Sequence, residues 1–368
     1  MNIVSPSITP RQWMFVVATF VQGSILQIST FLNVTEQSSW VPVLGGYLLG
    51  LVMVAVYLKL TALYPGKNLM EINGLIFGKV LGKAVSVLYM FFFFSVAVLN
   101  LSDTNHFVSE YLLPSTPDMV IAALLMLACI LAVRKGIDAI ARYGAAVGVI
   151  QIVITITLTL LAFKDVRPSN ILPLFDFPFK AFVQGTHTAL TFSYLDVLAL
   201  LMVVPNAANA KENRKSFVIG FSIGAAVLML IVLVITGIMG PLMGYFSAAR
   251  FETVRYINVI EIFSRMDTLF ALALIVMRFF KISVLLYASV LAFSQICELK
   301  TYMPLSSVLG ALAACASLFV FRSAGENADW GRNVTAVYSS LFEIILPVLT
   351  LLLYYLRGLV KKRRTRTA

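Results

Sequence analysis

Ten predominantly apolar stretches recur along this chain, and short polar segments separate them. An α-helix rises about 1.5 Å per residue and the hydrocarbon core of a bilayer is roughly 30 Å thick, so about 20 apolar residues cross it. Charged residues make up only 12% of the sequence, against about 25% in an average soluble domain. The stretches lie at residues 11–32, 40–63, 81–101, 118–133, 142–163, 185–204, 216–240, 267–296, 304–321 and 335–356. The sequence therefore predicts an all-α integral membrane protein, a single polytopic domain over residues 1–368 with ten transmembrane helices.

The basic residues predict how the chain is oriented in the membrane. Most Lys and Arg residues outside the apolar stretches fall in segments on the same side as the N-terminus. Because such residues concentrate in cytoplasmic loops, both termini are expected in the cytoplasm, as an even number of crossings requires. The tail at 357–368 is strongly basic, which suits contact with anionic lipid headgroups. The net charge of +11 is therefore explained by membrane lipids and needs no nucleic acid.

Residue types that carry catalysis or bind metals are scarce and scattered in the sequence. The chain has three cysteines and two histidines, and no cysteine lies at a metal-ligand spacing from a histidine. We expect Cys129, Cys297 and Cys315 to be small apolar fillers. No nucleophile–histidine pairing or phosphate-binding loop is recognisable in the sequence. We therefore expect a protein that is not an enzyme and that has neither a metal site nor a cofactor.

The first apolar stretch contains a polar interruption, Gln22-Gly23-Ser24. Glycine costs a helix about 1 kcal/mol relative to alanine, so the helix can break here. A break would expose backbone N–H groups and the partial positive charge of a half-helix N-terminus, which suit a ligand carboxylate. Alternatively, Gly23 and Ser24 simply allow neighbouring helices to pack closely. The sequence alone leaves both interpretations open.

The sixth stretch contains an acidic residue, Asp196, after a polar segment at 186–194. A charge at the centre of a membrane helix costs about 2.5–3.5 kcal/mol on insertion scales, so Asp196 is expected to face protein or water. It can link two helices, accept hydrogen bonds from backbone freed by a break, or pair with a cation. The first and sixth stretches lie five apart, which is the offset of two inverted five-helix halves. The sequence thus predicts a transporter-like 5+5 inverted-repeat bundle with broken helices 1 and 6.

Three further charged residues lie inside apolar stretches. Arg278 and Lys281 share one face of the eighth stretch, since residues three apart are neighbours on a helix, and Glu343 lies in the tenth. Buried charges need partners, so these residues and Asp196 are predicted to form a charge network in the bundle interior. We expect Glu343 to pair with Lys281 or Arg278. Both a static ion pair and a titrating Lys281 that supports proton-linked gating fit the sequence.

Four short motifs occur in a characteristic order. They are the Ile-Thr-Pro-Arg-Gln stretch at 8–12, Gly23, the Phe-Ser-Tyr-Leu-Asp stretch at 192–196 that leads to Pro205, and the Arg-Met-Asp-Thr-Leu-Phe stretch at 265–270. In order and spacing they resemble the B subunits of bacterial spore germination receptors, a family of the amino acid/polyamine/organocation transporter superfamily. The third motif has serine and aspartate where that family usually has glycine and glutamate. Length, the ten stretches and the basic tail agree with the family over the whole chain.

The resemblance implies a nutrient-germinant-sensing subunit in the cell membrane or the spore inner membrane. It also implies assembly with a larger membrane A subunit and a lipoprotein C subunit, and a small nutrient ligand, commonly an amino acid. The ligand-binding residues predicted on this basis are Gly23, Ser24, Leu99, Ser193, Tyr194, Leu195 and Ser283. The main alternative is a secondary amino acid transporter coupled to protons through Asp196, Glu343 or Lys281. A third is a scaffold whose pocket has decayed.

Overall fold

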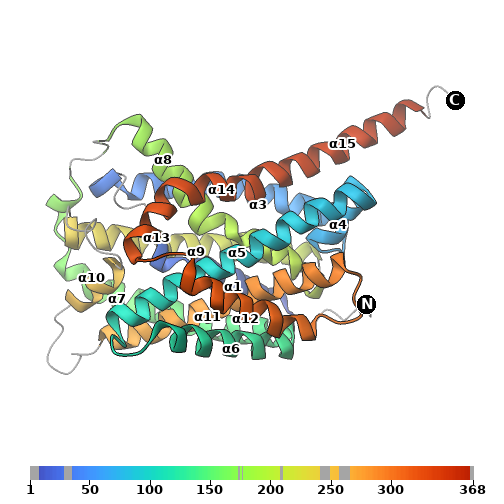
Figure 1. Ribbon diagram of the computed structural model, residues 1–368. Helices are drawn as coiled ribbons and strands as arrows, with labels where there is room; N and C mark the ends of the chain where they lie inside the picture. The colour runs from blue at the N-terminus through green and yellow to red at the C-terminus, as the bar shows by residue number, and fades with distance from the viewer. Residues whose placement is uncertain are drawn as a thin grey trace.

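The computed structural model describes residues 8–28, 35–172, 175, 177–207, 210–240, 249–256 and 266–364, and these residues are almost entirely helical. Figure 1 shows most of the long helices lying roughly along one direction, with α15 extending beyond the rest of the bundle. The α-helices are α1 (Pro10–Gln22), α3 (Trp40–Leu63), α4 (Leu69–Phe77), α5 (Lys79–Tyr111), α6 (Asp118–Lys135), α7 (Ile137–Ala162), α8 (Phe179–Ala189), α9 (Ala210–Met239), α10 (Ala249–Tyr256), α11 (Met266–Ile296), α12 (Met303–Phe319), α13 (Ala324–Trp330), α14 (Ala336–Ser340) and α15 (Leu346–Arg364).

Tighter and wider helical segments interrupt or join these helices. The 3-10 segments are η1 (Ile25–Gln27), η2 (Glu36–Ser38), η3 (Phe163–Asp165), η4 (Pro168–Asn170), η6 (Leu195–Met202) and η7 (Val204–Asn206). The π segments are η5 (Leu190–Tyr194), η10 (Gly331–Thr335) and η11 (Leu341–Ile345). The basic tail predicted at 357–368 continues α15 as far as Arg364.

Six helices among the described residues are long and apolar enough to cross a membrane. They are Trp40–Leu63, Lys79–Tyr111, Ile137–Asp165, Lys211–Met239, Asp267–Ile296 and Asn333–Arg357. These six coincide with the second, third, fifth, seventh, eighth and tenth apolar stretches of the sequence. The other four stretches contain the shorter helices α1, α6, α8 with its continuation, and α12. The count of ten crossings therefore stays a prediction.

Apolar side chains cover the outer faces of the bundle as well as its interior. Leu48 and Val52 of α3, Leu124 of α6, Leu160 of α7 and Phe319 of α12 are each more than half exposed. Soluble proteins rarely leave extended apolar surface in water, whereas lipid chains solvate it. These faces therefore fit a chain that lies in a bilayer.

Helix α1 is buried along most of its length, between α9, α7 and α11. It begins with a capping box, in which the Thr9 hydroxyl accepts from the Gln12 N–H and the Gln12 side chain accepts from the Thr9 N–H, and Pro10 is its first residue. Gly220 of α9 permits close approach, because a Cβ atom there would lie 2.2 Å from the carbonyl oxygen of Met14. This packing fixes α1 in the interior, where its C-terminal end reaches the candidate site.

The helical geometry changes at both positions where breaks were predicted. Helix α1 ends at Gln22, and the chain passes through Gly23 and Ser24 into the 3-10 turn η1. Helix α8 continues into π-helical η5 and then into 3-10 η6, which begins at Leu195. The last stretch is also irregular, because η10 and η11 flank the short helix α14. Segments of π-helix are rare and frequently lie at functional sites, so these irregular turns direct attention to the space between them.

Candidate ligand pocket and buried charges

The break in α1 is filled by a lysine from α11. Lys281 is fully buried, and its ammonium group lies 2.6 Å from Oδ2 of Asp196 on η6. The same group donates a hydrogen bond of 2.7 Å to the Ser24 hydroxyl and lies 5.4 Å from the centre of the Phe20 ring. One side chain thus links both interrupted spans, with the attraction of a ring face added to the ion pair.

Gly23 provides the space for this lysine. A Cβ atom at Gly23 would lie 2.9 Å from Cδ of Lys281 and 3.0 Å from its Cβ. The Gly23 N–H donates to the Thr19 carbonyl at 2.9 Å, and the Ser24 N–H donates to the Val21 carbonyl at 3.1 Å. These two backbone groups are therefore engaged within the chain. Helix breakage and close packing occur together here, and the lysine occupies the place that the sequence analysis gave to a ligand carboxylate.

Replacing Gly23 with alanine is expected to destabilise the protein by about 1–3 kcal/mol, because the added methyl group overpacks the path of the Lys281 side chain. Thermal unfolding of the purified protein in detergent measures the loss. Gly74 of α4 is the matched control, since a Cβ atom there meets nothing within 4 Å. Gly74→Ala should be neutral or stabilising by up to about 1 kcal/mol. Equal stability of the two variants would contradict the packing described for Gly23.

The second buried cation, Arg278, is held by α5. Its NH1 group donates to Oδ1 of Asn100 and lies 3.7 Å from Oδ2 of Asp103. Asp103 also accepts hydrogen bonds from Nε2 of Gln27 at 3.1 Å and from Nδ2 of Asn327. One carboxylate therefore connects four parts of the fold, namely η1, α5, α11 and α13.

Glu343 does not form the pairing expected from the sequence. The structure pairs Lys281 with Asp196 and Arg278 with Asp103, so both cations are taken up by aspartates. Glu343 lies on η11 and is fully buried, and within the described residues neither of its carboxyl oxygens accepts a hydrogen bond. The sequence identified the four buried charges, but it contained no information on which helices are neighbours.

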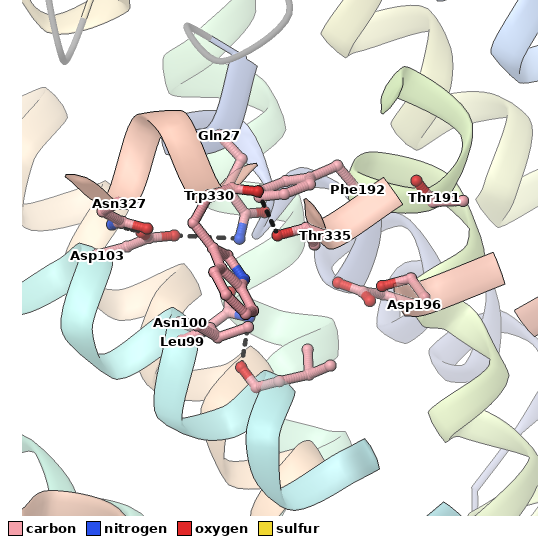
Figure 2. A pocket seen from close by; sticks show the side chains of 12 residues that line it. Gln27, Leu99, Asn100, Asp103, Thr191, Phe192, Asp196, Asn327, Trp330 and Thr335 are labelled. Atoms are coloured by element: carbon pink, nitrogen blue, oxygen red, sulfur yellow. Dashed lines mark hydrogen bonds between the residues drawn. The ribbon is translucent and has the colours of Figure 1, made fainter. Parts of the chain in front are cut away.

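A small polar pocket lies beside these charges, and Figure 2 shows it from close by. Helix α5, η1, the π segments η5 and η10, and the helix α13 all contribute to it. The lining residues are Gln27, Val96, Leu99, Asn100, Asp103, Thr191, Phe192, Asp196, Asn327, Trp330, Thr335 and Ser339. The lining combines carboxylate, amide and hydroxyl groups with aromatic and aliphatic walls, which is the usual make-up of a site for a small polar ligand.

Helix α13 and its last residue, Trp330, form one wall of the pocket. In Figure 2 the Trp330 side chain lies among the lining residues, with Asp103 and Asn327 on one side and Thr191 and Asp196 on the other. The cavity has a volume of about 20 Å³, enough for roughly one water molecule. A molecule larger than water therefore does not fit in this arrangement. We call α13 the pocket lid.

The predicted site residues fall into three groups. Leu99 and Asp196 line the pocket, whereas Gly23 and Ser24 contact Lys281. The lining does not include four further predicted residues, which are buried nearby: Ser193, Tyr194, Leu195 and Ser283. The Tyr194 ring packs against rings of α3 and α9, and its hydroxyl donates to the Val43 carbonyl at 3.4 Å. Ligand binding by these residues stays a prediction.

Sequence reasoning missed three residues that organise the pocket, Asp103, Asn327 and Trp330. Asp103 lies in a polar helix end that reads as an ordinary solvated terminus, and the other two lie between apolar stretches. One signal in the sequence could have indicated Asp103. Asn100 and Asp103 are three residues apart, so they form a polar patch on one face of the helix. The position of α13 beside the pocket depends on tertiary packing, and no local sequence pattern predicts it.

The sequence family is decided by comparison with known proteins. A family model described as "Spore germination protein" matches residues 7–324. This chain belongs to the spore germination protein family. It is 28% identical to spore germination protein KB of Bacillus subtilis (strain 168) over 372 residues, which cover 98% of this chain and 97% of that protein. It is 24% identical to spore germination protein YndE of the same strain over 288 residues, covering 76% of this chain and 78% of that protein.

The fold of this spore germination protein is that of solved transporters. A Na⁺-coupled sialic acid symporter in its substrate-bound outward-open state aligns with a TM-score of 0.59 and 11% identity, covering 94% of this chain and 78% of that chain. Mhp1, a nucleobase-cation-symport-1 family transporter, aligns in a closed conformation with a TM-score of 0.59 and 11% identity, covering 92% and 78%. At such identities the likeness concerns the fold alone. Six apolar helices and the family together identify a multi-pass membrane protein.

Proposed function

We propose that this protein is a nutrient-germinant-sensing subunit of a spore germination receptor that binds a small molecule, such as an amino acid, in the pocket beneath α13. The observation that carries the proposal is the convergence of two interrupted spans on one buried ion pair next to a polar pocket. In transporter folds the ligand site lies where helices are interrupted. The family supports the germination role, and the fold supports this kind of site.

The proposed topology has ten crossings in two inverted halves of five helices. The irregular segments η1 and η5–η6 fall in the first and sixth apolar stretches, at corresponding positions of the two halves. Both termini lie in the cytoplasm, and the protein resides in the cell membrane or the spore inner membrane. The excess of basic residues on one side and the basic tail support this orientation.

The proposed mechanism is a shift between a closed and an open arrangement of the pocket lid. The pocket holds only about one water molecule when closed, so a nutrient binds the open arrangement and raises its population. Opening separates Asn327 from Asp103, and Asp103 transmits the change to η1 through Gln27 and to α11 through Arg278. A larger membrane A subunit and a lipoprotein C subunit then read the changed surface.

Blocking the pocket provides the direct test. Leu99 lines the pocket on α5, and Leu99→Trp would fill the space that a ligand needs. The purified protein is screened against amino acids and sugars by thermal shift, because a ligand present at 100 times its Kd stabilises the native state by about 2.7 kcal/mol. We expect at least one nutrient to raise the unfolding temperature of the unmodified protein, and Leu99→Trp to lose that rise.

The matched control is Leu124→Trp, the same substitution on the exposed face of α6. It should retain the full ligand-induced rise in unfolding temperature. An equal rise in both variants would remove this pocket as the binding site. If no nutrient shifts the unmodified protein, the reading as a scaffold whose pocket has decayed is favoured.

A proton-coupled secondary amino acid transporter is the second candidate. The buried carboxyl groups and the likeness of the fold to symporters favour it. Uptake of labelled amino acids into liposomes separates the two functions. A sensing subunit binds without accumulating its ligand, whereas a coupled transporter accumulates it when a pH gradient is applied.

A further inference from the structure

Glu343 is a fully buried acid without a partner for its charge. It lies on η11, a π segment of the last span, and no part of its side chain reaches solvent. Within the part of the chain that the structure describes, both carboxyl oxygens lack a hydrogen-bond partner. An ionised carboxylate in such a place is strongly disfavoured, whereas a neutral acid needs only one acceptor for its O–H group.

The groups around Glu343 come from four elements, and their positions limit the possible charge. Tyr57 of α3 donates its hydroxyl to the backbone carbonyl of Glu343, and Tyr89 of α5 donates to the carbonyl of Phe342. Neither hydroxyl therefore serves the carboxyl group. Lys281 of α11 exerts a favourable charge, but its ammonium group is already bound. The carboxyl group of Asp196 on η6 also acts on Glu343 electrostatically, but no hydrogen bond joins the two carboxyl groups.

The count of charges gives the same result. Two buried cations, Arg278 and Lys281, face three carboxyl groups, those of Asp103, Asp196 and Glu343. The two aspartates neutralise the two cations as ion pairs. An ionised Glu343 would leave an excess negative charge beside Asp196, and two close carboxylates cannot share a dry site without a proton.

We propose that Glu343 is a proton-binding site, which holds a proton on its own carboxyl group beside the carboxylate of Asp196. A small movement of the Glu343 side chain would let the protonated acid donate to Asp196, which keeps its ion pair with Lys281. The bound proton thereby joins η11 of the last span to the break in the sixth. If the protein is a proton-coupled transporter, Glu343 is the place where the coupled proton binds. If the protein only senses its ligand, Glu343 is protonated in the same way.

The test compares Glu343→Gln with the unmodified protein, purified in detergent without added nutrient. Infrared spectra in H₂O and D₂O detect the carbonyl stretch of a buried carboxylic acid, which we expect in the unmodified protein and not in the variant. Glutamine mimics the neutral acid and can still donate to Asp196. Glu343→Gln is therefore expected to unfold at or above the temperature of the unmodified protein. The difference should widen as the pH rises, because only the unmodified protein must hold a proton to stay folded.

Asp196→Asn is the contrasting variant, since it removes the partner of Lys281 and should lower the unfolding temperature throughout the pH series. The proposal is overturned if Glu343→Gln leaves the infrared spectrum unchanged. It is also overturned if Glu343→Gln is destabilised as strongly as Asp196→Asn, because that outcome means Glu343 is needed as an anion. Neither measurement uses a ligand, so failure here is separate from failure of the proposed nutrient pocket.

Discussion

Replacement of Lys281 with methionine is expected to destabilise the protein by about 3–5 kcal/mol and to abolish its nutrient response. Methionine has a similar length and removes only the charge and the hydrogen-bond donors. The carboxylate of Asp196, 2.6 Å from the ammonium group, would then be buried without a cation, and Ser24 would lose its donor. The two interrupted spans would no longer be joined. Unfolding of the purified protein and a nutrient dose–response in spores measure the two effects.

An exposed ion pair of the same chain supplies the control. Lys67 lies 2.9 Å from Glu71, both side chains are at least a third exposed, and the two residues are four apart in the sequence. Lys67→Met should cost less than about 1 kcal/mol. The double variant Lys281→Met with Asp196→Asn should regain part of the lost stability, because no charge remains unpaired. A Lys281→Met variant as stable as Lys67→Met would disprove the importance of the buried pair.

Replacement of Asp103 with asparagine is expected to cost about 3 kcal/mol, at the lower end of the range for a buried pair because Asp103 is 15% exposed. Arg278 would remain buried with its hydrogen bond to Asn100 but without its paired carboxylate. The pocket lid would also lose the carboxylate that holds Asn327. We therefore expect both a lower unfolding temperature and a disturbed nutrient response.

Asn327→Ala separates these two effects, because it frees the lid and leaves Arg278 paired. The lost hydrogen bond to a charged group is worth about 1.5 kcal/mol. If the loss lowers the free energy of opening the pocket by this amount, the half-maximal nutrient concentration falls by up to about tenfold. A nutrient response that is unchanged in Asn327→Ala would contradict the role of α13 as the lid.

The elements predicted from the sequence are those that follow from local chemistry. Apolar runs gave the positions of the helices because a bilayer tolerates only helices with satisfied backbone groups. Gly23 and Asp196 indicated the two breaks, since each is costly inside a membrane helix and therefore marks a special environment. The three π segments had no such signal.

Pairing within the site was beyond the sequence for a physical reason. The composition of the apolar stretches shows that Lys281, Arg278 and Glu343 are buried, but a buried cation takes whichever carboxylate the packing of helices brings near it. Close packing of α5 against α11 brings Asp103 to Arg278. The change in helical pattern at η5 and η6 brings Asp196 to Lys281. Glu343 is left without a cation. Its unpaired carboxyl group is the basis of the proposed proton site.

The ammonium group in the break of α1 is covalently part of the protein, and this attachment has an energetic consequence. A dissolved metal ion in the same position would enter from one side of the membrane and leave on the other, and it would carry the energy of its gradient into the protein. Lys281 is bonded to the backbone and cannot leave the protein in this way. The side chain can therefore stabilise one arrangement of the bundle over another, and a gradient can act at this position only through a proton that the amine binds and releases.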